Sequence, residues 1–312
     1  MRNIVLLGAG SIGLSFAAAF SDRGHAVTLA EPDTTRREAA QAGIAAQLEA
    51  IGRAGLRVDA GGKVAIVSDA GPALAPADLV IECGPERLDV KQAIFADLLA
   101  RAGSGTVLAT ASSAIPMSRI VTDPADQRRC LVAHPVNPPS VLRLIELAPA
   151  PGTAPETVAK ARACFAEAGF EAVALAREIE GFVLNRLQGA VLREAYRLVG
   201  EGVVDVAGVE AVMRLGLGPR WALSGPFETV ELNTPGGIRA HAARMGPAYR
   251  AMGEERGETD AAWGDDLVAV VDSQRRAALP LDGLPARAAW RVRAVAELVA
   301  LRDRLYGDAD GK

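Results

Sequence analysis

Short apolar runs alternate with helical segments through the first half of the chain. The runs at residues 4–7, 26–30, 63–67, 79–83, 106–109 and 130–133 are almost wholly apolar. Runs of this length and composition are typical of strands buried on both faces. Their alternation with helical segments predicts a doubly wound α/β sheet, in which ligands bind at the carboxyl ends of the strands.

Beyond residue 175 the pattern changes to a longer, helical periodicity. Apolar positions in residues 179–198 recur at the spacing of one helix face, and further helices are predicted at residues 205–215, 261–278 and 286–305. A chain of 312 residues is long enough for two hydrophobic cores. The sequence therefore predicts an α/β domain over residues 1–178 and an all-α domain over residues 179–312.

Composition and charge narrow the classes of partner. The formal net charge is −4, so a basic surface for nucleic acid or anionic membrane is not expected. No apolar stretch reaches membrane-spanning length, and the apolar run at the N-terminus is too short for a signal peptide. The three cysteines are odd in number and lack metal-ligand spacing. These features predict a cytoplasmic protein without a bound metal.

The first apolar run leads directly into a glycine-rich turn. Gly8, Gly10 and Gly13 form a GxGxxG pattern between a predicted strand and a predicted helix. Such glycines let the backbone approach a pyrophosphate, and the helix N-terminus supplies unpaired N–H groups. Glu31 ends the next strand, where an acid binds the adenosine ribose and favours NAD over NADP. The first domain is therefore predicted to be a Rossmann-type NAD-binding domain.

An imidazole and a carboxylate lie at the ends of two apolar runs that a proline-rich loop connects. His134 follows residues 130–133, and Glu146 lies near the end of residues 141–147. If the two runs are adjacent strands, the side chains meet, and a His with a carboxylate partner is a general base. For an isolated pair, a core His beside a surface Glu is the simpler interpretation. The nucleotide-binding pattern around the pair favours the base.

Other polar residues follow predicted strands at their carboxyl ends. Glu86 comes after residues 79–83, and Lys91 follows five residues later; by themselves they are typical of a solvated surface pair. Ser112 and Ser113 come after residues 106–109, and either cap the next helix or hold a substrate oxygen beside the His.

A glycine–proline loop in the second half carries Arg220. An Arg in an apolar, turn-rich setting suits bidentate binding of a carboxylate. By sequence alone, a surface Arg with its stem packed on Trp221 is about equally consistent.

These segments together resemble the 3-hydroxyacyl-CoA dehydrogenase superfamily. The resemblance rests on Gly8-Ala-Gly-Ser-Ile-Gly, Pro85-Glu86 with Lys91, Ser112-Ser113, His134-Pro-Val-Asn-Pro-Pro, Glu146 and Gly181-Phe-Val-Leu-Asn185-Arg-Leu. The His134 loop, residues 181–188 and the segment around Arg220 are most similar to the branch of L-gulonate 3-dehydrogenase and lambda-crystallin. The loop after Pro139 departs from that branch, because it reads Ser-Val-Leu-Arg143.

The resemblance implies an NAD-dependent dehydrogenase that oxidises the 3-hydroxyl of a small, L-gulonate-like hydroxy acid. It implies His134 as the catalytic base with Glu146 as its partner, and Ser113 and Asn185 as the residues that hold the reacting oxygen. It implies NAD contacts at Gly8, Gly10, Ser11, Ile12, Gly13, Glu31, Glu86 and Lys91, and favours Arg220 as a substrate contact. It also implies a homodimer built through the helical domain.

Three alternatives stay open at this stage. Two are enzymes, a short-chain 3-hydroxyacyl-CoA dehydrogenase and a carnitine dehydrogenase. The third is a crystallin-like structural protein that binds NAD with little turnover.

Overall fold

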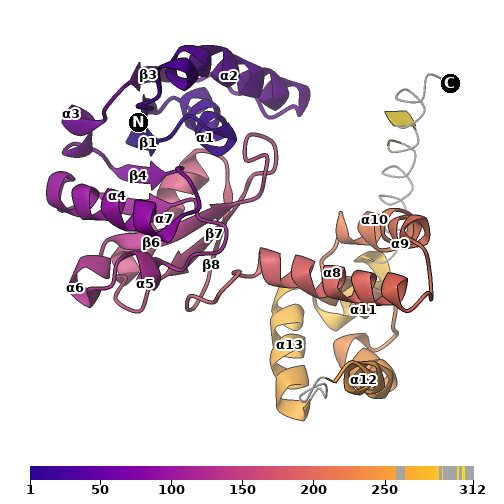
Figure 1. Ribbon diagram of the computed structural model, residues 1–312. Coiled ribbons are helices and arrows are strands. Elements are labelled where there is room, and N and C mark those ends of the chain that lie inside the picture. Colours follow the sequence, from indigo (N-terminus) through magenta and orange to yellow (C-terminus); the bar gives the residue numbers. More distant parts are fainter. Residues whose placement is uncertain (258–263, 288–289, 291–300, 302–303, 306–312) are drawn as a thin grey trace. The chain divides into compact units, whose positions relative to one another are not determined.

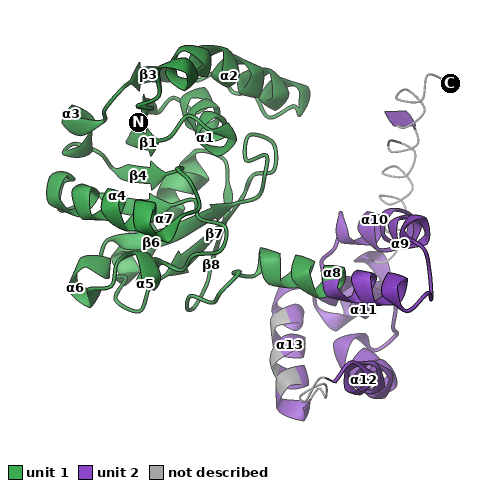
Figure 2. Cartoon of the chain, viewed as in Figure 1, with its two compact units in different colours: residues 1–192 green, residues 193–312 purple. Residues whose placement is uncertain are grey.

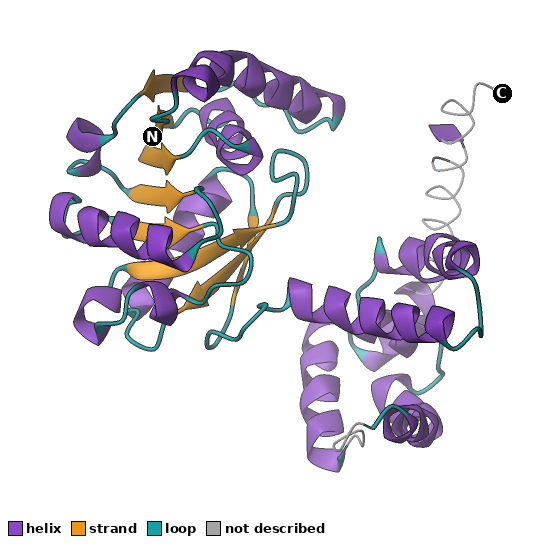
Figure 3. Cartoon of the chain, in the orientation of Figure 1, coloured by secondary structure: helices purple, strands orange, loops and turns teal. Residues whose placement is uncertain are grey.

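The computed structural model describes residues 1–257, 264–287, 290, 301 and 304–305 (Figure 1). The chain divides into two compact units, residues 1–192 and 193–312 (Figure 2). The first unit holds the sheet, and the described part of the second unit is helical (Figure 3). Helix α8 (Leu184–Gly200) begins in the first unit and ends in the second, so the predicted boundary after residue 178 stays a prediction.

The first unit is built on one eight-stranded sheet with the order β3-β2-β1-β4-β5-β6-β7-β8. The strands are β1 (Asn3–Leu7), β2 (Ala26–Ala30), β3 (Lys63–Val67), β4 (Leu79–Glu82), β5 (Val107–Thr110), β6 (Cys130–Pro135), β7 (Leu144–Pro149) and β8 (Glu171–Ala174). All neighbouring strands pair in parallel except β6 and β7, which are antiparallel. The predicted doubly wound α/β sheet is confirmed. Its central strands β4, β5 and β6 are buried at every position, as expected of apolar strands that are covered on both faces.

Seven helices of the first unit cover the two faces of the sheet. They are α1 (Ser11–Asp22), α2 (Thr34–Arg53), α3 (Gly71–Leu74), α4 (Leu88–Arg101), α5 (Met117–Ile120), α6 (Pro124–Gln127) and α7 (Pro155–Glu167). α1, α2 and α7 contribute to the core on one face, and α3, α4 and α5 to the core on the other. Fully buried Phe16, Phe20 and Phe165 lie in the first core, and each such side chain contributes roughly 1.5–3 kcal/mol.

The helix expected from residue 179 begins instead at Leu184. Gly181 has a φ of +76° and Phe182 a φ of +49°, and left-handed backbone of this kind cannot continue a right-handed helix. The Phe182 side chain is fully buried against the face that carries α4 and α5. Residues 179–183 are therefore a turn that leads from the sheet into α8.

The second unit continues with further helical elements. They are α9 (Val206–Val212), the π-helical turn η1 (Met213–Leu217), α10 (Gly218–Trp221), α11 (Pro226–Leu232), α12 (Gly237–Glu255), α13 (Asp265–Ala278) and the short η2 (Leu281–Gly283). The prediction of an all-α second domain is confirmed over the residues of that unit that the structure describes. Most of the helix expected at residues 286–305 lies outside the described residues. None of the helices in the described ranges is both long and apolar enough to cross a membrane.

Candidate active site

A cleft of about 890 Å³ opens at the carboxyl ends of β1, β2, β3 and β4. Gly8, Gly10 and Glu31 lie in its wall. A side chain added at Gly10 would meet no atom of the protein within 4 Å, so the backbone here is open to a ligand. One added at Gly13 would overlap the carbonyl oxygen of Gly8, so the helix packs directly on the turn. These glycines fit the close approach of a pyrophosphate.

The first turn of α1 offers unpaired backbone donors. The first i→i−4 bond of the helix is the one that Leu14 makes, donating its N–H to the carbonyl of Gly10 at 2.9 Å. The N–H groups of Ser11, Ile12 and Gly13 therefore have no acceptor within the helix. Together with the helix dipole they suit an anionic group.

Glu31 connects the glycine turn to the end of β2. One carboxylate oxygen accepts the N–H of Ala9 at 2.9 Å and the other accepts the N–H of Asp33 at 3.0 Å. Arg37 donates to the carbonyl oxygens of Glu31 and Pro32 at 2.9 and 3.0 Å, which directs this guanidinium to the backbone. The acid at the β2 end is thus held in place beside the cleft.

His134 and Glu146 are brought together by the antiparallel pairing of β6 and β7. The two residues lie directly opposite in the register, and Nδ1 of His134 is 2.8 Å from Oε2 of Glu146. Both residues are buried. The other oxygen, Oε1, accepts the N–H groups of Val183 and Leu184 at 2.9 and 3.0 Å.

The pKa of Glu146 lies below its usual range. Burial by itself raises the pKa, but the hydrogen bonds from His134 and from the N–H groups of Leu184 and Val183 more than offset it. The carboxylate is therefore ionised at neutral pH and orients the imidazole.

Phe182 was not anticipated from the sequence as a site residue. Its ring lies 5.2 Å from that of His134, centroid to centroid and tilted by 43°, and its backbone is left-handed. A glycine followed by an aromatic residue next to the Asn185 motif was the only available signal.

Ser113 and Asn185 also meet. The side-chain amide of Asn185 donates to the backbone carbonyl of Ser113 at 2.7 Å. The loop after β5 and the first turn of α8 are therefore joined at the two residues expected to hold a substrate oxygen.

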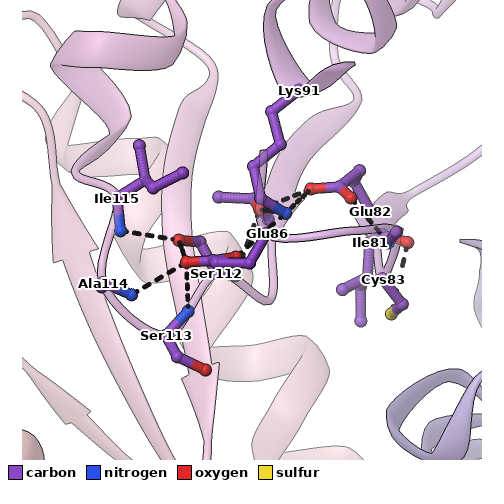
Figure 4. Close-up of polar contacts among 11 residues, drawn as sticks. Ile81, Glu82, Cys83, Glu86, Lys91, Ser112, Ser113, Ala114 and Ile115 are labelled. Atoms are coloured by element: carbon purple, nitrogen blue, oxygen red, sulfur yellow. Dashed lines mark hydrogen bonds and ion pairs between the residues drawn. The ribbon is translucent and has the colours of Figure 1, made fainter. Parts of the chain in front are cut away.

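Glu86 and Lys91 belong to a larger polar network at the ends of β4 and β5 (Figure 4). The ammonium of Lys91 lies 2.7 Å from Glu82 and 3.4 Å from Glu86. Glu86 in turn accepts the hydroxyl of Ser112 at 2.6 Å. Glu82 and its neighbour Thr110 were missed, although a charged residue ending an apolar strand signals a buried partner.

Other elements carry Arg220 and the two further histidines of the chain. Arg220 belongs to the second unit, on α10, with an exposed side chain. His25 is buried at the start of β2, where its Nδ1 accepts the N–H of Arg2 at 3.2 Å. The Nδ1 of buried His241 lies 3.2 Å from the hydroxyl of Thr234. Within the ranges that the structure covers, no group of three His, Cys, Asp or Glu residues is placed to hold a metal ion.

Two family models match this chain and together cover most of its length. The family model for the NAD-binding domain of 3-hydroxyacyl-CoA dehydrogenase matches residues 3–179, and that for its C-terminal domain matches residues 181–277. The chain belongs to the 3-hydroxyacyl-CoA dehydrogenase family. This family member is accordingly an NAD-dependent oxidoreductase, and the predicted cofactor is confirmed.

Three similar proteins carry names that state different functions. Rabbit (Oryctolagus cuniculus) lambda-crystallin is 36% identical over 240 residues, covering 75% of each chain. L-Carnitine dehydrogenase of Streptomyces griseus is 36% identical over 308 residues, covering 97% of this chain and 88% of the relative. The crystal structure of 5-formyl-3-hydroxy-2-methylpyridine 4-carboxylic acid 5-dehydrogenase, an NAD⁺-dependent dismutase, has a TM-score of 0.71 at 27% identity and covers 98% of this chain and 99% of that one.

Proposed function

We propose that this dehydrogenase oxidises the 3-hydroxyl of a small, free hydroxy carboxylate, with an L-gulonate-like acid as the first candidate. The observation that carries the proposal is the bond between Nδ1 of His134 and the carboxylate of Glu146. It leaves Nε2 as the ring nitrogen that faces the substrate hydroxyl.

His134 acts as the general base. Its Nε2 accepts the proton of the substrate hydroxyl, while its Nδ1–H donates to the ionised Glu146. The carboxylate stabilises the imidazolium that forms, and it keeps its own position through the N–H groups of Val183 and Leu184. A positioned base of this kind accelerates a reaction by about 10²–10⁴-fold. NAD, when bound, supplies the hydride acceptor.

Ser113 and Asn185 position the reacting oxygen. One N–H of the Asn185 side-chain amide donates to the carbonyl of Ser113. The second N–H and the oxygen of the same amide are then available to the substrate. Ser113 lies on the loop after β5 and is exposed. The two side chains together fix the hydroxyl relative to the base.

The cofactor site uses the glycine turn and the first turn of α1. Gly8, Gly10 and Gly13 would admit the pyrophosphate, and the N–H groups of Ser11 and Ile12 would hold its oxygens. Each Glu31 oxygen is bound to one backbone N–H and keeps a lone pair for a ribose hydroxyl.

Two relatives support a free carboxylate as the substrate. L-Carnitine dehydrogenase and the pyridine carboxylic acid dehydrogenase are named for free acids, and each covers nearly the whole of this chain. L-Gulonate and carnitine are both 3-hydroxy carboxylates, so one Arg would serve either. We assign that role to Arg220, which sits on a glycine–proline turn. Carnitine is the second candidate, because its dehydrogenase matches the chain over the greatest length among the relatives above.

We also infer a homodimer. On α8, Leu187, Leu192 and Tyr196 are 57%, 46% and 78% exposed, and contiguous exposed apolar side chains are typical of protein–protein contact sites. Static light scattering tests this, and a monomer mass would refute it.

The decisive experiment follows NADH absorbance with purified protein, NAD and L-gulonate, carnitine, 3-hydroxybutyrate or 3-hydroxybutyryl-CoA. Turnover of a free acid, with a raised KM in Arg220→Met, supports the proposal. Turnover of the CoA ester alone would refute the free-acid site. Tight NAD binding without turnover of any compound would favour a crystallin-like structural role.

A further inference from the structure

Lys91 is a lysine whose side chain is almost completely buried, at 1% exposure. A buried ammonium is costly unless it is paired and hydrogen-bonded. Its nitrogen lies 2.7 Å from Oε2 of Glu82, 3.4 Å from Oε2 of Glu86 and 3.4 Å from the hydroxyl of Thr110. The ammonium therefore bridges two carboxylates and does not reach the surface of the cleft.

Glu82 is the fixed end of this bridge. Its side chain is fully buried at the end of β4. Oε2 also accepts the hydroxyl of Thr110, the last residue of β5, at 2.6 Å, and Oε1 accepts the N–H of Gly84 at 2.6 Å. The two central strands thus hold the carboxylate that holds Lys91.

Glu86 is the end of the bridge that contacts the loop after β5. Its Oε1 accepts the Ser112 hydroxyl at 2.6 Å and the N–H groups of Ser113 and Ala114 at 3.1 and 3.0 Å (Figure 4). Burial raises its pKa, but these bonds and the Lys91 ammonium outweigh that effect and lower it. Ser113 then accepts the amide of Asn185. One carboxylate thereby holds residues 112–114 of the loop after β5.

We propose that Glu82 and Lys91 are positioning residues, which set Glu86 and through it the Ser113–Asn185 pair that holds the reacting oxygen. The proposal rests on the proposed function and assigns Lys91 a role through Glu86 in place of the expected contact with NAD. Glu86 is 41% exposed on its side chain, so without the ammonium its Oε2 loses its buried charge partner and only the bonds from the loop to Oε1 hold the carboxylate. A misplacement of the loop by about 1 Å would cost up to 10²-fold in turnover.

The test compares Lys91→Met, Glu82→Gln and the double variant by steady-state kinetics and by calorimetric titration with NAD. Lys91→Met is expected to lower kcat by about 10- to 100-fold and to change the NAD Kd by less than about threefold. The fall in kcat of the double variant should be no larger than that of Lys91→Met, because both substitutions break the same Glu82–Lys91–Glu86 bridge. A rise in the NAD Kd that matches the fall in kcat would overturn the proposal in favour of direct cofactor contact. If the fold-losses in kcat of the two single variants multiply in the double variant, the two residues act separately and the proposal is overturned.

If Lys91→Met does not fold, two milder variants test the proposal instead. The double variant leaves no unpaired buried charge, and Thr110→Val removes only one bond to Glu82. Both should show the same selective loss of kcat, the Thr110 variant to a smaller extent. Arg87→Met is the matched control, because Arg87 precedes the same helix and pairs with exposed Asp89. Its kinetics should equal those of the unaltered protein, and an equal loss in this control would overturn the proposal.

Hydrogen exchange separates this proposal from the proposed function. The amides of Ser113 and Ala114 donate to Glu86, so Lys91→Met should raise their exchange rates at least tenfold. Amides of β1 should be unaffected. This readout needs no substrate, so it is informative even if none of the acids is turned over. Unchanged exchange at both amides would overturn the positioning role.

Discussion

The carboxylate of Glu146 joins Nδ1 of His134, 2.8 Å away, to the N–H groups of Val183 and Leu184 at the start of α8. One side chain thereby sets the ring of His134 and satisfies two donors that the helix leaves unpaired. The arrangement depends on the left-handed turn at Gly181 and Phe182, which points both N–H groups at the same oxygen. The Glu146 carboxylate therefore fixes the proposed base relative to the beginning of α8.

Replacing the base should abolish turnover without loss of the cofactor. His134→Ala is expected to lower kcat by about 10²–10⁴-fold, because it removes the proton acceptor, and to leave the NAD Kd within about twofold. Stopped-flow NADH formation and calorimetric titration measure the two quantities. His241→Gln, a change at a buried His of the second unit, is the control and should retain turnover. Near-normal turnover in His134→Ala would exclude it as the base.

Glu146→Gln should reduce stability in a pH-dependent manner. The folded-state pKa of Glu146 is depressed, so its stabilising contribution is fully present above the unfolded pKa of about 4.3 and is lost as the pH falls through the folded value. The variant should therefore be less stable than the unaltered protein at pH 7 by about 1–3 kcal/mol. The difference should shrink below about pH 4. Urea unfolding at both pH values checks this, and a constant difference would contradict it.

Two glycines of the same turn should respond differently to alanine. At Gly10 the added methyl group meets no protein atom within 4 Å, so Gly10→Ala should keep its stability but lose NAD affinity about tenfold or more. At Gly13 the methyl group overlaps the carbonyl of Gly8, so Gly13→Ala should lose both stability and affinity. Gly52→Ala, in open space on α2, serves as the control. Unchanged NAD affinity in Gly10→Ala would remove the pyrophosphate from this position.

Phe182 should matter for catalysis beyond its share of the core. Phe182→Leu is expected to cost on the order of 1 kcal/mol of stability, as should Phe165→Leu in the opposite core. Only Phe182→Leu should lower kcat, because its ring supports His134 at 5.2 Å. Thermal unfolding and steady-state kinetics of both variants test this. Equal kcat in the two variants would make Phe182 a packing residue only.

The sequence by itself determined the α/β class, the glycine turn and the acid at the end of β2. These features are local: a strand, three glycines and a helix start follow one another along the chain, and their periodicity needs no distant partner. It also indicated His134 and Glu146, because both sit in apolar runs joined by a short loop. Their common face follows from the register of a single antiparallel pair.

Only the tertiary structure decided where the charged side chains point. Lys91 and Glu86 are compatible with a surface pair by spacing, and the partner that buries Lys91 is Glu82, on a neighbouring element. The start of α8 likewise depended on Gly181 and Phe182 adopting left-handed backbone, which burial of the Phe182 ring beside His134 favours. Helical periodicity did not predict this start, because tertiary packing routinely overrides local helix propensity.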